Sequence, residues 1–179
     1  MNYPHDLEKL IEYYPNLNRF MMSTNFTGTN WFDQFYRFLK ILGKFPNRRF
    51  SFNLQLSIDG PTNINDNQRG IGTTKLFTEH FMDFLDTIED NLPNNVRLVT
   101  FFKPTLTSEL FPKLQTRDEI IEYYRFFELY YSAFHSKIKN TDRIIMNPSV
   151  PNTACPSPHT KEDGILFANI CRISREIVN

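Results

Sequence analysis

The chain has few cysteines and no excess of positive or negative charge. Its 179 residues include only two cysteines, Cys155 and Cys171, which do not build the disulfide framework of a small secreted domain. Lysine and arginine number 20, as do aspartate and glutamate, so the formal net charge is zero. This balance excludes an overall electrostatic attraction to nucleic acids or anionic membranes. We therefore expect neither as a partner.

Long apolar runs and a signal-peptide pattern are also missing. The first residues are polar, and no apolar stretch approaches the length that crosses a membrane. A hydrophobic fraction of 40% and a charged fraction of 22% are values of a globular protein. A chain of this length buries a sizeable core as one domain. The sequence therefore predicts a single cytoplasmic domain over residues 1–179.

Segments with helical and extended patterns alternate along the chain. Apolar residues at helical spacing predict helices over residues 7–14, 31–42, 76–88 and 116–134, and a last helix after the proline-rich loop at 148–159. Short apolar runs predict strands over residues 19–23, 50–56, 96–102 and 143–146. Thr116 and Glu119 have the spacing of a capping box. This alternation predicts right-handed βαβ units and an α/β fold with about four parallel strands.

Polar residues follow each predicted strand where it ends. These positions are held by Ser23-Thr24-Asn25, Ser57-Ile58-Asp59, Lys103-Pro104-Thr105 and Asn147-Pro148. The carboxyl ends of parallel strands meet at one edge of a sheet, and ligands bind at that edge. The end of the second strand has the most polar and charged residues nearby. Gly60-Pro61 ends the strand, and Asp66 and Arg69 follow in the next segment. The sequence therefore predicts a ligand site around this segment.

The second strand end resembles a motif of the radical S-adenosylmethionine (radical SAM) enzymes, in the branch that matures peptides and sulfatases. There the fourth strand ends in Ser-x-Asp-Gly-Pro, and a His-Asp pair and an Arg follow. Here Ser57-Ile58-Asp59-Gly60-Pro61 precedes Asn65-Asp66 and Arg69, so Asn65 stands where the family often has His. Ser23-Thr24-Asn25 is similar to the family's third-strand end, Thr-Asn-Gly, with Phe26 in place of the glycine. The resemblance covers roughly residues 19–102.

This resemblance implies a partial TIM-like barrel, a fragment of a (β/α)6 barrel, that binds S-adenosylmethionine (SAM) across its strand ends. Carried over residue by residue, Ser57 would hydrogen-bond the methionine carboxylate or the ribose, and Arg69 would pair with the carboxylate. Asn25 and Asp59 would line the same pocket or shape its turn. Arginine offers a bidentate fork to a carboxylate, and serine both donates and accepts. The implied activity is reductive cleavage of SAM and radical chemistry, with a peptide as a candidate substrate.

The family's cluster-binding motif, Cys-x-x-x-Cys-x-x-Cys, is absent from this sequence. In the family it holds a 4Fe–4S cluster, and Cys155 and Cys171 do not replace it. The Gly-Gly-Glu segment of the family's second strand is also absent. The resemblance therefore implies the carboxyl-side part of a core domain, inactive alone, whose cluster-binding amino-terminal half is encoded upstream or supplied by a partner. The alternative is a non-catalytic α/β binding or scaffold module derived from such an enzyme.

Other polar residues give weaker signals. Cys155 and His159 share one loop, but two ligands do not make a zinc site, and we predict no metal ligands. Asp59 and Asp66 allow a third hypothesis, a hydrolase that uses paired carboxylates. Two acids in one loop are more often turn formers, so this hypothesis ranks last. The sequence identifies no catalytic residue.

Overall fold

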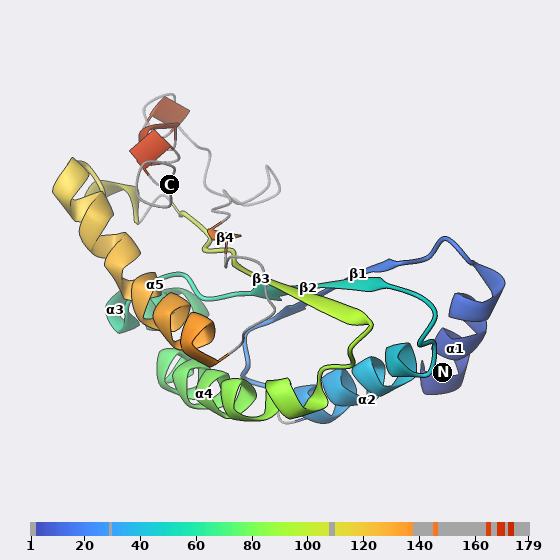
Figure 1. Ribbon diagram of the computed structural model, residues 1–179. Helices are drawn as coiled ribbons and strands as arrows, with labels where there is room; N and C mark the ends of the chain where they lie inside the picture. Colours follow the sequence, from blue (N-terminus) through green and yellow to red (C-terminus); the bar gives the residue numbers. More distant parts are fainter. Residues whose placement is uncertain are drawn as a thin grey trace.

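A computed structural model describes residues 3–28, 30–107, 110–137, 145–146, 164–165, 168–170 and 172–173. In chain order its elements are α1 (Tyr3–Tyr13), β1 (Arg19–Thr24), α2 (Trp31–Gly43), β2 (Phe50–Leu56), α3 (Thr62–Arg69), α4 (Thr73–Asn91), β3 (Val96–Phe102), the 3-10 helix η1 (Phe111–Lys113), α5 (Arg117–Lys137) and β4 (Ile145–Met146). Strands alternate with helices, so the predicted α/β fold is confirmed (Figure 1).

The strands form one parallel sheet in the order β1-β2-β3-β4. β1, β2 and β3 are full strands, whereas β4 contributes two residues beside Phe101 and Phe102. Because the spatial order follows the sequence, right-handed crossovers place successive helices on the same face. Figure 1 shows α2 and α4 side by side beneath the strands. In the described part of the chain this sheet is open, and it does not close into a barrel.

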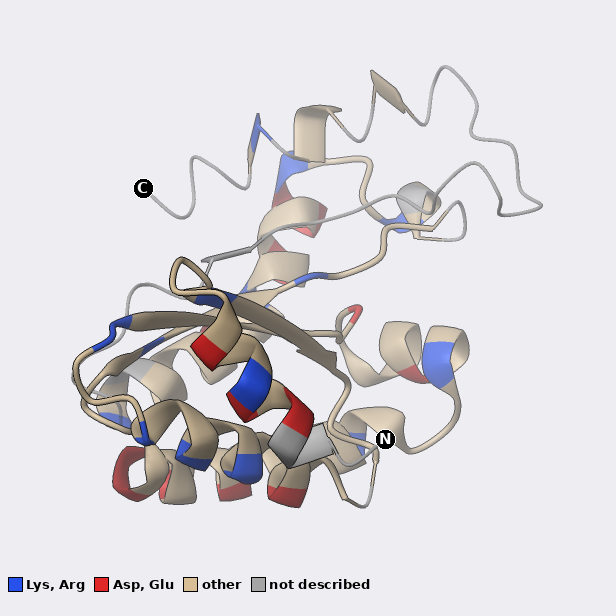
Figure 2. Ribbon diagram, turned by 90° about the vertical axis from the view of Figure 1, so that its right-hand side faces the viewer, with Lys and Arg blue, Asp and Glu red and all other residues tan. Residues whose placement is uncertain are grey.

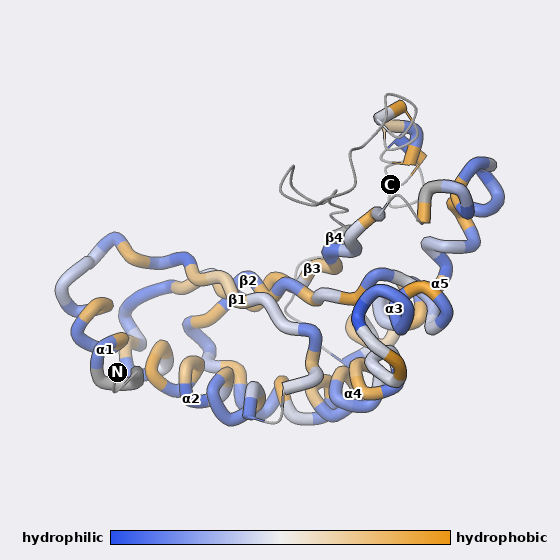
Figure 3. Tube along the Cα trace, turned by 180° about the vertical axis from the view of Figure 1, so that it is seen from behind, coloured by the Kyte–Doolittle hydropathy of each residue, from blue (hydrophilic) through white to orange (hydrophobic). Residues whose placement is uncertain are grey.

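The core lies between the sheet and these two helices. Strand residues alternate between faces, and Phe52 and Leu54 are examples of the alternate strand residues that are buried toward the helices. Apolar and polar positions alternate along α2 and α4 (Figure 3). The helical period places the apolar residues, such as Phe35 of α2 and Phe81 of α4, on the buried face of each helix. The rings of Phe35 and Phe52 meet edge to face, with their centroids 5.2 Å apart. Apolar burial therefore decides which face of each strand turns inward.

The opposite side of the sheet is polar along β2. In β2 its residues are Ser51, Asn53 and Gln55, all half-buried. The register places Met21 of β1 beside Asn53, and Val99 of β3 on its other side. We call the row formed by Ser51, Asn53 and Gln55 of β2 the polar face of the sheet. A polar face on a parallel sheet is unusual, because such sheets are normally covered on both sides.

The predicted elements match the observed ones except around α3. The sequence pattern places a loop where α3 lies and starts the next helix at residue 76, whereas α4 begins at Thr73. Asparagine and aspartate are poor helix formers, so the segment TNINDNQR shows no helical signal. Of the predicted fourth strand, residues 145–146 are observed in β4, and residues 164–165, 168–170 and 172–173 of the predicted last helix are helical. Cys155, His159 and Cys171 lie outside the described residues.

The capping box at the start of α5 is confirmed. The Thr116 hydroxyl accepts a hydrogen bond from the Glu119 amide at 3.2 Å, and the Glu119 carboxylate accepts one from the Thr116 amide at 2.8 Å. These two bonds satisfy backbone donors that a helix start leaves without partners. The donors at Thr116 hold the pKa of Glu119 below its usual value.

Charged residues of both signs are interspersed along the helices that cover the sheet (Figure 2), in keeping with the zero net charge. Among the described elements, no helix combines the length and the apolar character needed to cross a membrane.

Candidate functional site

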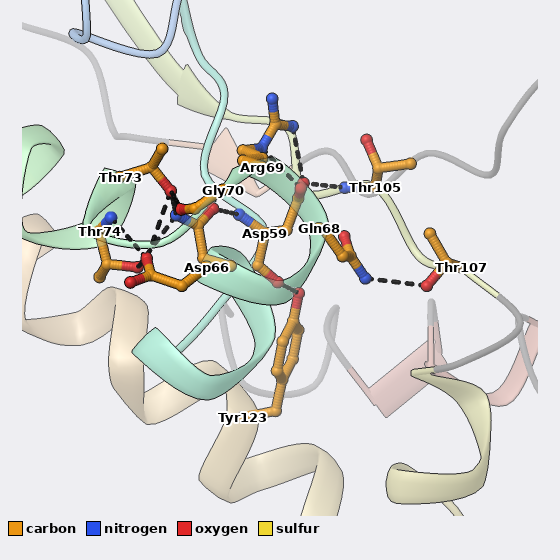
Figure 4. A network of polar contacts seen from close by, with 11 residues as sticks. Asp59, Asp66, Gln68, Arg69, Gly70, Thr73, Thr74, Thr105, Thr107 and Tyr123 are labelled. Carbon is orange, nitrogen blue, oxygen red and sulfur yellow. Dashed lines mark hydrogen bonds and ion pairs between the residues drawn. The ribbon is translucent and has the colours of Figure 1, made fainter.

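Asp59 connects three elements at the carboxyl edge of the sheet. Its residue surface is only 2% exposed. The Arg69 guanidinium at the end of α3 approaches the carboxylate with two nitrogens: Nη2 donates to Oδ1 at 2.8 Å, and Nε lies 2.6 Å from Oδ2. The backbone amide of Thr105, after β3, donates to the same Oδ1 at 2.7 Å. The Tyr123 hydroxyl of α5 donates to the Asp59 carbonyl at 2.6 Å (Figure 4).

The Asp59–Arg69 ion pair decides what Arg69 offers to a ligand. A side-on pair of this kind is geometrically specific, because the guanidinium is planar. With Nε and Nη2 turned to Asp59, a ligand carboxylate would meet Nη1, which points away from Asp59 in Figure 4. The Arg69 side chain is 24% exposed, so part of it is accessible from solvent. Asp59 thus holds Arg69 in one orientation and does not itself offer a free carboxylate.

Asp66 lies in α3, and its carboxylate caps the start of α4. Its carboxylate accepts hydrogen bonds from the amides of Gly72 and Thr74 at 2.6 and 2.8 Å, and from the Thr74 hydroxyl at 2.6 Å. These bonds to Thr74 and Gly72 lower the pKa of Asp66 to about 2. The group is therefore an ionised helix cap at neutral pH. With Asp59 paired to Arg69, neither acid is available for the paired-carboxylate hydrolase hypothesis.

Asn65 occupies the position where the resembling family often has histidine. It is 1% exposed, and its Oδ1 accepts a hydrogen bond from the Asp59 amide at 2.9 Å. Its Nδ2 donates to the hydroxyls of Thr73 and Thr74 at 3.1 and 3.0 Å. A neutral imidazole also provides one acceptor and one donor, so asparagine can make the same kind of bridge. Asn65 thereby ties the site loop to the start of α4.

Asn25 shapes the turn after β1. Its Oδ1 accepts hydrogen bonds from the Thr27 amide and hydroxyl at 3.2 and 2.8 Å, which is an Asx-type turn. Phe26 follows with a φ of 57°, in the left-handed region that favours glycine. The resembling family has glycine at this place. Phe26 is fully buried, and its ring meets that of Trp31 edge to face at 4.3 Å, so packing offsets the backbone cost.

Ser57 stands directly at the end of β2, two residues before Asp59. Its amide donates to the Thr24 carbonyl of β1 at 2.8 Å, which continues the ladder between the strands. The residue is half-buried, and within the described part of the chain its hydroxyl has no hydrogen-bond partner. Of the four predicted site residues, Asp59 and Arg69 are in contact, Ser57 begins their loop, and Asn25 follows the neighbouring strand.

Three contributors to this network, Asn65, Thr105 and Tyr123, are not among the four predicted site residues. Thr105 belongs to a predicted polar strand end, but its amide bond to Asp59 spans 46 residues of sequence. Tyr123 is buried, and its hydroxyl donates to the Asp59 carbonyl across 64 residues of sequence. Burial raises the pKa of Tyr123 well above its ordinary value, so its hydroxyl remains a donor. Asn65 could be identified only as a departure from the family motif.

A groove of about 720 Å³ lies at the other edge of the sheet, where the strands begin. Arg19, Arg49 and Arg97 contribute to its lining. Arg19 and Arg97 flank Ser51 in one row of the sheet, because Ser51 is their register partner in both strand pairs. The groove is therefore distinct from the loop of Asp59. We assign the candidate site to the carboxyl edge, where parallel sheets bind ligands.

The described residues contain no group of three or more histidine, cysteine or acidic side chains placed to hold a metal ion. With two cysteines in the whole sequence, this chain does not fit a 4Fe–4S cluster by itself. Comparison of the chain with protein-family models, with curated proteins and with solved structures finds no match.

Proposed function

We propose that this chain supplies the SAM-facing strand ends of a radical SAM-type enzyme and works with a separate segment that holds the 4Fe–4S cluster. The observation that carries the proposal is the position of Arg69. A buried carboxylate holds its guanidinium in the loop that Ser57 begins at the carboxyl end of β2, and in the described part of the chain the Ser57 hydroxyl has no hydrogen-bond partner. A guanidinium held in one orientation, with Nη1 turned away from Asp59, and a serine hydroxyl in the same loop are groups that can donate hydrogen bonds to the carboxylate of an amino-acid moiety.

Each residue then has a defined task. Nη1 of Arg69 and the hydroxyl of Ser57 would bind the methionine carboxylate, and Asp59 would keep the guanidinium from rotating away. Asn25 would shape the adjacent strand end through its turn. Bound SAM would supply the sulfonium group whose reductive cleavage starts radical chemistry. No step through the cluster is assigned to this chain, because its cysteines do not fit one.

The architecture also supports this proposal. The strands follow one another in sequence order, and α2 and α4 cover one face of the sheet (Figure 1). The opposite polar face, with Ser51, Asn53 and Gln55, has the character of a surface that encloses a polar ligand. In a barrel-type enzyme that face would turn to the interior, and the strand ends would surround the ligand.

The test is titration of the full chain with SAM, followed by NMR. We expect shifts of the Ser57 and Arg69 resonances, and an affinity about fivefold to tenfold lower for Ser57→Ala, because one hydrogen bond contributes about 1 kcal/mol. Ser51→Ala is the matched control, since it removes the same hydroxyl from the same face at the far end of β2. Equal binding by wild type and Ser57→Ala, or no binding, would refute the proposal.

The alternative is a non-catalytic binding or scaffold module. The cysteine count favours it, and so does Asp59, which already occupies one side of the Arg69 fork. This alternative predicts that SAM changes neither the spectrum nor the thermal stability of the chain. The same titration therefore separates the two functions.

A further inference from the structure

The groove at the amino edge of the sheet gathers positive charge from three consecutive strands. Arg19 begins β1, Arg49 directly precedes β2, and Arg97 is the second residue of β3, and all three line the groove. Glu89 of α4 is the only acidic residue among the described residues of the lining. This lining therefore carries two more positive than negative charges, although the net charge of the whole chain is zero. Such a concave, positively charged surface attracts an anionic ligand.

The strands add no negative charge to this surface, because β1, β2 and β3 contain no aspartate or glutamate. Arg19 and Arg97 are register partners of Ser51 on its two sides, so the three residues share one face of the sheet. Neighbouring strands are about 4.8 Å apart, which places the Cα atoms of the two arginines about 10 Å from each other. Their long side chains can therefore reach one small anion that lies over the hydroxyl of Ser51.

Arg49 is held in place without losing its charge. Its Nη1 donates to the Asn94 carbonyl at 2.9 Å, and a carbonyl is a neutral acceptor. A guanidinium has five N–H donors, so Arg49 keeps further donors for a ligand. The neighbouring Arg48 differs, because it donates to the carbonyls of Pro15 and Leu17 at 2.8 and 2.7 Å and so serves the fold.

The wall of the groove between α4 and β3 is also fixed. The Val96 amide donates to the Pro93 carbonyl at 2.8 Å, which closes a turn. Asn95 is 7% exposed, and its Nδ2 donates to the carbonyls of Leu42 and Phe45 at 2.9 and 3.0 Å. These bonds tie the turn to the end of α2. A surface formed in advance loses little conformational entropy when a ligand binds.

We propose that this groove binds a small molecule that carries a phosphate monoester, with the phosphate over Ser51 between Arg19 and Arg97. A phosphate monoester has a charge close to −2 and three strong acceptor oxygens, which suit guanidinium groups that approach from several strands. A carboxylate has a single charge and suits this lining less well. The groove of about 720 Å³ has the size of a small-molecule site and exceeds a phosphate ion, and Leu92 and Pro93 offer apolar surface to the rest of the ligand. The proposal does not depend on SAM binding, which is assigned to the other end of the strands.

The first test is an NMR titration of the full chain with AMP, and with adenosine and inorganic phosphate for comparison. We expect AMP to shift the amide resonances of Ser51 and Arg97 but not that of Ser57, which follows the opposite end of β2. Adenosine lacks the phosphate and should leave Ser51 unchanged, and inorganic phosphate should bind more weakly than AMP. SAM binding is read at Ser57, so the two sites succeed or fail independently.

Several outcomes of this titration would overturn the proposal. They are equal shifts with adenosine and AMP, shifts at Ser57 in place of Ser51, equal affinities for AMP and inorganic phosphate, and no shift with AMP at all. Tighter binding of a short single-stranded RNA than of AMP would indicate a polymeric ligand and would overturn it as well.

Two pairs of exposed variants test the charges of the groove. Arg19→Gln should weaken AMP binding about fivefold to tenfold, whereas Arg37→Gln, on α2 and outside the described lining, should leave it unchanged. Glu89→Gln removes the acid of the lining and should strengthen AMP binding about twofold to fivefold. Asp90→Asn, the exposed neighbour outside the described lining, is its control.

The gain expected for Glu89→Gln guards against a false result, because a variant that folds poorly does not bind more tightly. Equal affinities of Arg19→Gln and Arg37→Gln, or of Glu89→Gln and Asp90→Asn, would refute a phosphate site in this groove.

Discussion

Replacing Asp59 by asparagine tests whether its carboxylate is a structural connector. Asparagine keeps the shape and the backbone contacts with Asn65 and Tyr123, so the change isolates the charge. The variant leaves the Arg69 guanidinium without its countercharge and weakens the acceptor of the Thr105 amide. An unpaired cation in a largely buried position is costly, because the protein replaces solvation poorly.

The expected loss follows from the burial of the two partners. Removing one member of a fully buried ion pair costs about 3–5 kcal/mol. Asp59 is 2% exposed but the Arg69 side chain is 24% exposed, so water compensates in part. We therefore expect Asp59→Asn to lower the free energy of unfolding by about 2–4 kcal/mol. For a domain of this size that is a fall in the melting temperature of about 5–12 °C.

Urea unfolding at neutral pH measures this loss. Trp31 is the only tryptophan and is buried among aromatic rings, so its fluorescence reports unfolding of the core. Asp86→Asn is the matched control, because it makes the same substitution in the exposed Asp86–Lys137 pair, where we expect a change below about 1 kcal/mol. An equal, small effect of both substitutions would show that Asp59 is not a buried connector, and would refute the reasoning.

Three further outcomes follow from the same region. The pKa of Asp66 is about 2 in the folded protein against an ordinary 3.8, so its stabilising effect is complete above about pH 4 and is lost toward pH 2. The difference in free energy of unfolding between wild type and Asp66→Asn, measured by urea unfolding across this range, should therefore become smaller as the pH falls. Gly60→Ala should lower the free energy of unfolding by about 2–4 kcal/mol, because residue 60 has a φ of +140° and a Cβ would lie 2.6 Å from the Tyr123 ring. Gly28→Ala, with open space around it, is the control, and equal urea midpoints of the two variants would contradict this expected loss. Phe26→Gly should relieve about 1 kcal/mol of backbone strain but lose about 3–5 kcal/mol of burial, so calorimetry should show net destabilisation, and a rise in melting temperature would show that strain dominates.

Local features of this protein were predictable from the sequence. The alternation of strand and helix patterns predicted the parallel sheet, and the capping box of Thr116 and Glu119 was found as expected. Both depend on residues that are near one another in the chain, where periodicity and backbone capping act directly. α3 was missed because its asparagines lack helical propensity, and contacts such as that of Asn65 with Thr74 stabilise it instead.

The sequence by itself determined that Ser57, Asp59 and Arg69 share one loop at a strand end, since they lie within a short segment after β2. Only the tertiary structure decided that Arg69 pairs with Asp59, and that Thr105 and Tyr123 complete the network. The partners of Asp59 come from α3, from the end of β3 and from α5. They meet because sheet register and helix packing bring together residues 46 and 64 positions apart. Sequence spacing does not specify such contacts, whereas burial makes each polar group require one.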